Sequence, residues 1–256
     1  MMSTYARSTR MPWRRAPRLA GLLLAAWACV PCPAAAQTGP QACGNPFRNH
    51  FGPYDFRTAP AETRKLVEDY HFTPGVESMT QPKNTMRSDM AQDVAYTLKV
   101  FPNHHRALIT MSRLSQRAKR DPPPGTDITV ECWFDRAVRF RPDDTVARSL
   151  YAQFLARSNR QADAERQLRL AQEHAQDNPL SHYNIGLVAM EAGLHRLALE
   201  QAHRALALGL PLQELAEQLR RANAWVEPGS AAAPAESGTP ASSPALPSPE
   251  TSAARP

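Results

Sequence analysis

Apolar and small side chains recur through residues 90–225 at helical spacing, and the pattern repeats with a period of about 34 residues. Three alanines mark the same place in successive units: Ala137, Ala171 and Ala205. Seven residues before each of them lies another small or branched apolar residue: Val130, Ala164 and Ala198. A period of this length is typical of helical repeats, in which each helix pair buries its apolar face against its neighbours. The pattern therefore predicts an all-α architecture for this part of the chain.

The period divides the middle of the chain into three helix pairs. The third pair, residues 179–212, has a small residue at Gly186, where two helices are expected to cross, and a turn at Gly193. The second pair covers residues 145–178. The first, residues 105–144, is longer by six residues. We assign the extra length to a turn insertion, Asp121–Thr126, because its three prolines cannot continue a helix.

The segments around the three pairs have different compositions. Residues 90–100 are expected to form the second helix of a degenerate earlier unit, and residues 212–225 a C-terminal capping helix. Residues 37–89 are predicted to be an extended, aromatic-rich segment with one short helix near 61–70, packed on the helices. Residues 226–256 consist mainly of Pro, Ala, Ser and Thr, and we expect them to be a disordered tail, either without a role or a spacer through the cell envelope.

The third pair resembles a tetratricopeptide repeat in its small residue at Gly186, its turn glycine and its closing Pro211. The second pair departs from that family at Arg148 and Gln176, where a large apolar residue and a proline are usual. The resemblance covers about residues 90–225 and implies a short right-handed solenoid of about three helix pairs. With the aromatic N-terminal segment and Phe101–Leu108, the chain is similar to exported proteobacterial tetratricopeptide proteins of unassigned role. This similarity implies a fold and a compartment, without a mechanism.

The start of the chain has the three parts of a secretory signal peptide. Leu19–Val30 is an apolar run of 12 residues, too short to span a bilayer, where about 20 are needed. Arginines precede the run, and Ala34–Ala36 follows as a small-residue cleavage site. We predict cleavage after Ala36, with Met1 or Met11 as the start, and no transmembrane anchor afterwards. The expected location is the periplasm or the medium; a lipoprotein attached at Cys29 is the alternative.

The charge of the chain is concentrated in this leader. The whole sequence carries 30 basic and 24 acidic residues, a net charge of +6. Residues 1–36 contain five arginines and no acidic residue, so the remainder has 25 basic residues against 24 acidic ones. A nearly neutral mature chain argues against nucleic-acid binding, which depends on an excess of positive charge.

Cleavage would leave two cysteines, Cys43 and Cys132, in an oxidising compartment. They have one intramolecular pairing, and we predict a disulfide. The alternative is two unpaired thiols, with Cys132 a small apolar residue inside a helix. Two cysteines without a CxxC spacing do not predict a metal site.

The sequence contains no pattern that indicates catalysis or a cofactor. It has no phosphate-binding loop, dinucleotide fingerprint, nucleophile elbow or HExxH motif. On a helix, His104 and His105 would point about 100° apart, so they could not readily bind one metal ion together. His195 and His203 are eight positions apart on one helix, roughly 12 Å, which is also too far for a shared ion. Asp143 and Asp144 follow a proline and are expected to cap a helix. We therefore expect a protein that is not an enzyme and holds neither a cofactor nor a metal.

The remaining hypothesis is a binding groove lined by the first helix of each pair. The register places these residues in it: Arg106, Ile109, Arg113, Arg117, Gln153, Arg157, Tyr183, Leu187 and Met190. One end is basic and the other apolar, which suits an extended peptide with acidic and apolar side chains. The predicted function is thus an exported scaffold for an envelope protein or peptide. The alternatives are a structural domain whose groove is filled by its own residues 43–81, and a binder of an anionic envelope polymer.

Overall fold

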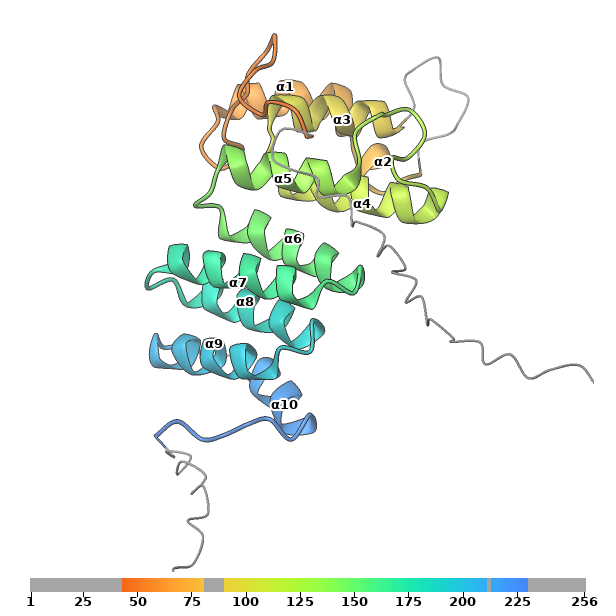
Figure 1. Cartoon of the computed structure of the whole chain (residues 1–256). Coiled ribbons are helices and arrows are strands. Elements are labelled where there is room, and N and C mark those ends of the chain that lie inside the picture. Colours follow the sequence, from red (N-terminus) through yellow and green to blue (C-terminus); the bar gives the residue numbers. More distant parts are fainter. Residues whose placement is uncertain (1–42, 81–89, 211–212, 230–256) are drawn as a thin grey trace, which may run out of the picture. The chain divides into compact units, whose positions relative to one another are not determined.

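The computed structural model describes residues 43–80, 90–210 and 213–229, which belong to one compact unit that begins at Thr38. Within these ranges every regular element is a helix (Figure 1). In chain order the helices are α1 (Ala61–His71), α2 (Pro74–Glu77), α3 (Met90–Val100), α4 (His105–Ala118), α5 (Val130–Phe140), α6 (Thr145–Arg157), α7 (Gln161–Ala175), α8 (Pro179–Glu191), α9 (His195–Ala207) and α10 (Glu214–Arg221). The all-α prediction is confirmed for these residues.

Six of the helices pack as three successive pairs: α4 with α5, α6 with α7, and α8 with α9. Each pair also contacts the next, because α6 lies against both α4 and α5, and α8 lies against both α6 and α7. The second and third pairs are offset by one period of the sequence pattern. Helix α6 begins at Thr145 and α8 at Pro179, while α7 begins at Gln161 and α9 at His195. The period in the sequence thus corresponds to a repeated two-helix unit.

Small residues of the period lie where helices approach each other closely. The alanines of both series are buried: Ala137, Ala164, Ala171, Ala198 and Ala205. A Cβ atom at Gly186 would clash with Leu215 of α10 and lie 3.3 Å from Cβ of Gln201 on α9. A side chain at position 186 would therefore force Leu215 to move and crowd Gln201.

Polar side chains cap the first helices of the second and third pairs. Asp144 accepts two backbone N–H hydrogen bonds at the start of α6, and Asn178 accepts one at the start of α8, at the equivalent position of the next repeat. The capping prediction is confirmed for Asp144. Its neighbour Asp143 instead forms ion pairs with Arg57 and Arg141.

The N-terminal segment is attached to α5 covalently. A disulfide joins Cys43 to Cys132 near the start of α5, across 89 positions of sequence, as predicted. Arg136, one turn further along α5, donates a hydrogen bond to the carbonyl oxygen of Cys43. The ring of Phe47 then packs on that of Phe140 at the end of α5, with 5.8 Å between centroids. Residues 43–47 therefore follow α5 closely.

The rest of this segment packs on α3 and on the turn that precedes α4. The amide of Tyr54 donates to the carbonyl oxygen of Val100 at 2.8 Å. The ring of Phe56 lies on that of His104, with centroids 3.9 Å apart, and also contacts Phe101. The segment is thus a packed layer on the first helices, as its aromatic content predicted.

The structure adjusts several predicted boundaries. The short helix expected near 61–70 is α1, and it packs against α3, so the expected preceding helix has a partner. The turn insertion separates α4 from α5 and is longer than predicted, because α4 ends at Ala118 and α5 begins at Val130. The capping helix, expected over 212–225, is confined to Glu214–Arg221 because Asn223, at φ 54°, leaves the helical conformation.

Some expectations concern residues outside the described ranges. The signal peptide over 1–36 and its Met11, Cys29 and Ala36 lie there, as does the tail from residue 230 onward. Among the described residues, none of the helices combines the length and apolar character needed to cross a bilayer.

Candidate binding groove

A groove lies between α4 and α6, the first helices of two successive pairs. It has a volume of about 190 Å³. Its lining residues are Ile109, Ser112, Arg113 and Gln116 of α4, Phe134 of α5, and Leu150, Gln153, Phe154 and Arg157 of α6. Four of the residues predicted from the sequence, Ile109, Arg113, Gln153 and Arg157, therefore meet in one place. We call this place the α4–α6 groove.

The α4–α6 groove has an apolar floor and a polar rim. Phe134 is buried, and its ring centroid lies 5.4 Å from that of Phe154. Ile109 is half-buried beside them, whereas Arg113 is exposed. Arg113 forms no hydrogen bond or ion pair with any residue that the structure describes. A free guanidinium beside an apolar floor suits a ligand that carries a carboxylate next to an apolar side chain.

The other two predicted arginines of α4 contact the N-terminal part of the chain. Arg106 forms ion pairs with Glu68 of α1 and with Glu77 of α2, the latter at 2.9 Å. Arg117 donates to the carbonyl oxygen of Met79 at 3.0 Å. These two arginines therefore hold residues 68–79 against α4 and do not line the α4–α6 groove.

At the α6 side of the groove, the rim residues Gln153 and Arg157 contact α8 of the next helix pair. Glu191, at the end of α8, accepts a hydrogen bond from Gln153 and lies 3.8 Å from a guanidinium nitrogen of Arg157. The side chains of Arg157 and Glu191 are both exposed, so solvent screens this ion pair. Arg157 therefore lines the α4–α6 groove and also lies close to Glu191 of the same chain.

The residues predicted from the third pair lie elsewhere. Tyr183 is buried, and burial together with the Glu214 carboxylate raises the pKa of its hydroxyl. Leu187 and Met190 are partly buried against the core. The physical reason is α10, which packs on both α8 and α9 and supplies Glu214. Tyr183, Leu187 and Met190 therefore do not line the α4–α6 groove.

Residues 43–80 do not enter the α4–α6 groove. Its lining, as far as the structure describes the chain, comes from α4, α5 and α6. Residues 43–60 follow α3 and α5, while Glu77 and Met79 contact α4 beside the groove. The N-terminal segment thus occupies part of the α4 surface and leaves Arg113 accessible.

Sequence reasoning missed a polar cluster beneath the N-terminal segment. The buried side-chain amide of Asn103 donates to Asp55 at 2.7 Å and to Asp144 at 2.8 Å. Both oxygens of Asp144 also lie 2.9 Å from Nε2 of His105. These partners are 41 and 48 residues from Asn103, so no local spacing could reveal the cluster. The cluster joins the N-terminal segment at Asp55, the start of α4 at Asn103 and His105, and the start of α6 at Asp144.

The histidines near this cluster have structural contacts. Nδ1 of His104 accepts a hydrogen bond from the amide of Ala107, which caps α4. Burial lowers the pKa of His104 to about 4, against the opposing effect of Glu68. The ring is therefore neutral at physiological pH and unsuited to proton transfer near pH 7. In the described ranges, no three His, Cys, Asp or Glu side chains are placed to hold a metal ion.

Comparison of the chain with protein-family models, with curated proteins and with solved structures finds no match. The α4–α6 groove and its chemistry are therefore the basis for the proposed function of the chain.

Proposed function

We propose that the chain is a non-enzymatic scaffold of the tetratricopeptide type that binds a protein partner in the bacterial cell envelope. The α4–α6 groove is the binding site, and it takes an extended segment with an acidic side chain next to a bulky apolar one. The observation that carries this proposal is Arg113, an exposed guanidinium without a partner among the described residues, above the apolar floor of Ile109 and Phe154.

The repeat architecture supports this assignment. Three stacked helix pairs place α4, α6 and α8 in neighbouring positions. Stacked pairs of this kind produce extended surfaces on which peptides bind. Export is supported by the leader-like sequence before Gln37 and by the disulfide, which persists in an oxidising compartment.

The chain itself contains an example of the recognition that we propose. Arg106 forms an ion pair with Glu77, and Arg117, on the same helix that carries Arg113, donates to the backbone carbonyl oxygen of the apolar residue Met79. Glu191 similarly approaches Arg157. Arg106 and Arg157 therefore already pair with internal acidic residues, and Arg113 is free to pair with an external one.

The second candidate is a structural domain in which residues 68–79 cover part of the α4 surface and no partner binds there. The observation that favours it is the contact of residues 68–79 with Arg106 and Arg117. In that case Arg113 takes no part in binding another protein. Binding of an anionic polymer would instead make charge reversal at any exposed arginine have a similar effect, and salt would weaken it steeply.

The test is capture of partners from envelope extracts with Arg113→Glu, compared with Arg196→Glu as a control of equal charge change. Arg196 lies on α9, is 83% exposed and makes one ion contact, at 3.9 Å. We expect a partner that binds the unchanged chain and Arg196→Glu but not Arg113→Glu, and that a peptide with adjacent Glu and Phe displaces. Equal capture by both variants would contradict the groove assignment, and equal loss would favour the polymer.

A further inference from the structure

Basic side chains gather at the C-terminal end of α4. Arg113, Arg117, Lys119 and Arg120 are all exposed, and none of them forms an ion pair with a residue that the structure describes. Arg117 donates a hydrogen bond to the carbonyl oxygen of Met79, but a carbonyl group has no net charge with which to neutralise the guanidinium. We call Arg117, Lys119 and Arg120 the α4-end cluster.

The negative charge beside the α4-end cluster is smaller than its positive charge. Asp121 is the next residue in the sequence, and its side chain accepts a hydrogen bond from the amide of Val130 at the start of α5, at 2.9 Å. The C-terminal end of a helix contributes about half a negative charge. Three cations exceed the sum of these two contributions, so the α4-end cluster leaves a positive patch on the surface.

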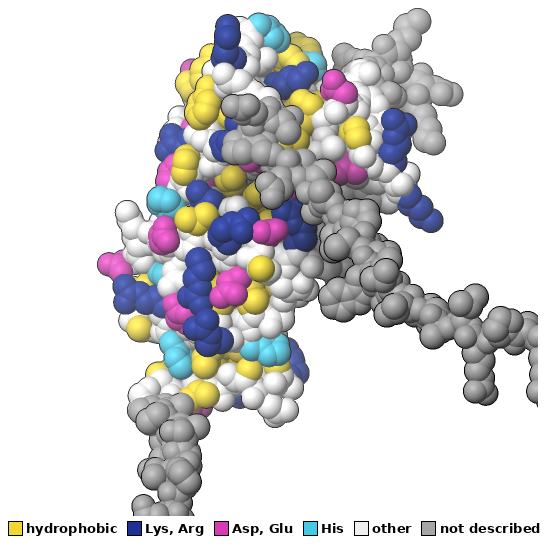
Figure 2. All heavy atoms as spheres, viewed as in Figure 1, with side chains coloured by type: hydrophobic (Ala, Val, Ile, Leu, Met, Phe, Trp, Pro, Cys, Tyr) yellow, Lys and Arg dark blue, Asp and Glu magenta, His cyan; other side chains and the backbone are white. Residues whose placement is uncertain are grey.

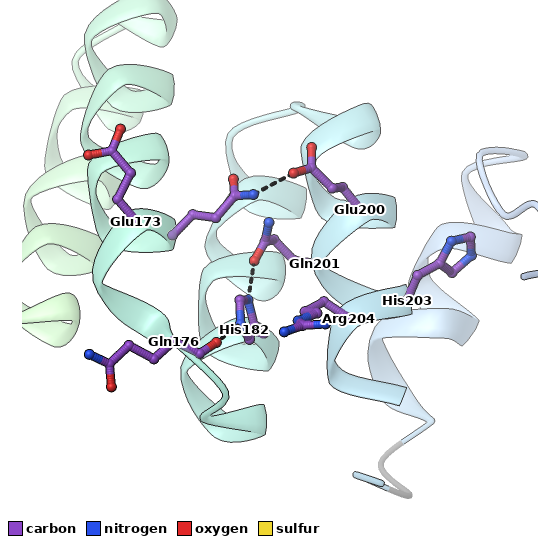
Figure 3. Close-up of a pocket in the computed structure, with 8 residues that line it drawn as sticks. Glu173, Gln176, His182, Glu200, Gln201, His203 and Arg204 are labelled. Carbon is purple, nitrogen blue, oxygen red and sulfur yellow. Dashed lines mark hydrogen bonds between the residues drawn. The ribbon is translucent and has the colours of Figure 1, made fainter. Parts of the chain in front are cut away.

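The later helices differ, because their charged side chains pair with one another. In Figure 2, basic and acidic side chains alternate over α6–α9, and the ion pairs of this region include Arg169 with Glu200 and Arg204 with Asp177. A cavity of about 530 Å³, lined by residues of α7, α8 and α9, shows the same feature (Figure 3). Its Glu200 side chain also accepts a hydrogen bond from Gln172. The arginines of that cavity wall are therefore neutralised within the chain, unlike those at the end of α4.

The α4–α6 groove leads toward the α4-end cluster. On α4 its lining residues extend from Ile109 to Gln116. Seven positions of a helix correspond to about two turns, so the groove follows α4 for that distance. Gln116, the last of these lining residues, is followed at once by Arg117. A ligand that lies along the groove and continues past Gln116 therefore reaches the positive patch.

The spacing of Arg113 and Arg117 matches the repeat of an extended peptide. Residues four apart on a helix lie on one face, and the rise per residue separates these two by about 6 Å along the axis. In an extended chain, side chains two positions apart point to the same side and are roughly 6.7 Å apart, while the side chain between them points to the other side. An extended ligand can therefore direct two side chains toward α4 and the intervening one away from it.

We propose that the ligand of the α4–α6 groove contains an acidic, an apolar and an acidic residue in succession, with one carboxylate bound by Arg113 and the other by the α4-end cluster. This inference rests on the proposed function and adds the position of a second acidic group. Arg117 uses one hydrogen bond for Met79 and keeps further N–H donors for a carboxylate. Lys119 and Arg120 add positive charge at the same end of the helix.

The experiment is an NMR titration of the full chain with two capped peptides, Ala-Glu-Phe-Glu-Ala and Ala-Glu-Phe-Gln-Ala. They differ only in the charge of the second acidic position. We expect the peptide with two glutamates to bind about fivefold more tightly at low ionic strength, the size of effect that an exposed charge pair gives. This preference should decrease as salt is added, because salt screens exposed charges.

Lys119→Gln/Arg120→Gln tests the assignment to the α4-end cluster without removing Arg117. In this variant the preference should fall below about twofold. The matched control is Arg196→Gln/Arg221→Gln, which makes the same change of charge at exposed positions of α9 and α10 and should keep the full preference. All four substituted side chains are exposed, so both variants are expected to fold.

The possible failures of the proposal are distinguishable. Equal affinity for the two peptides, with binding abolished by Arg113→Glu, would overturn the second acidic position and leave the groove assignment intact. An equal loss of preference in both double variants would assign the effect to the overall charge of the chain and would also overturn it. If neither peptide binds, the proposed function of the groove fails together with this inference.

Discussion

Nη1 of Arg148 lies 2.9 Å from Oε1 of Gln167, and both side chains are buried between α6 and α7. The tetratricopeptide family that the sequence resembles usually carries a large apolar residue at this position. Burial lowers the pKa of Arg148, and the charge of Glu173 opposes this effect. A charge is tolerated inside a protein when hydrogen bonds replace its hydration, which Gln167 and the Pro142 carbonyl do here.

The Arg148–Gln167 contact predicts a non-additive pair of substitutions. Gln167→Met should lower the free energy of unfolding by about 2 kcal/mol, because it leaves a buried guanidinium nitrogen without its acceptor. In Arg148→Met/Gln167→Met the unpaired group is gone, and we expect most of that loss to be recovered. Urea unfolding followed by circular dichroism measures the single variants Gln167→Met and Arg148→Met and the double variant. A double variant whose loss equals the sum of the single losses would contradict this explanation.

The disulfide should contribute strongly to stability. Closing a loop of 89 residues reduces the entropy of the unfolded chain by an amount equivalent to about 4.6 kcal/mol. We expect reduction to lower the urea midpoint, and Cys43→Ser/Cys132→Ser to reproduce that midpoint and to be insensitive to reductant. If the reduced chain and the oxidised chain unfold at the same urea concentration, the N-terminal segment is held by its other contacts.

Gly186→Ala should destabilise the third helix pair. The added methyl group meets the side chain of Leu215 and approaches Cβ of Gln201, so we expect a loss of about 1–3 kcal/mol. Leu215→Ala removes the main obstacle. Gly186→Ala should therefore cost less in the Leu215→Ala background than in the unchanged chain, and equal costs in both would show that Leu215 is not the cause.

Acid should weaken the attachment of the N-terminal segment. Burial opposes ionisation of Asp55, but hydrogen bonds from Arg57 and Asn103 outweigh it and lower the pKa of Asp55 to about 2. Its ordinary value is 3.8, so the unfolded chain takes up this proton first. Stability from this group is therefore present above about pH 4 and is lost as the pH falls toward 2.

The measurement is thermal unfolding between pH 2 and pH 6. We expect Asp55→Asn to be less stable than the unchanged chain at pH 6 and to show a shallower decline below about pH 4. Glu62→Gln, at an exposed position of α1, is the control and should follow the unchanged chain. An equally steep decline in Asp55→Asn would assign the acid sensitivity to other carboxylates, such as Asp143, whose pKa the hydrogen bond from Arg141 lowers.

The sequence predicted the helices more reliably than the site. The small residues and the repeat period located α4–α9 because close helix packing tolerates few side chains at a crossing. Gly186 is the clearest case, since an added methyl group would force the Leu215 side chain to move. For the groove, the register placed Ile109, Arg113, Gln153 and Arg157 together. The register could not show that Tyr183 is buried, because α10, which packs on α8, lies in a separate segment of the chain.

By itself, the sequence determined the elements that depend on local chemistry. Proline and glycine positions, capping residues and the apolar period act within a few residues of one another, so they can be read along the chain. The tertiary structure alone decided which charged groups are used internally. Arg106 and Arg117 bind residues 68–79, whereas Arg113, on the same helix and of the same residue type, has no partner among the described residues. The difference is set by segments distant in sequence that pack beside α4, and that proximity exists only once the chain has folded.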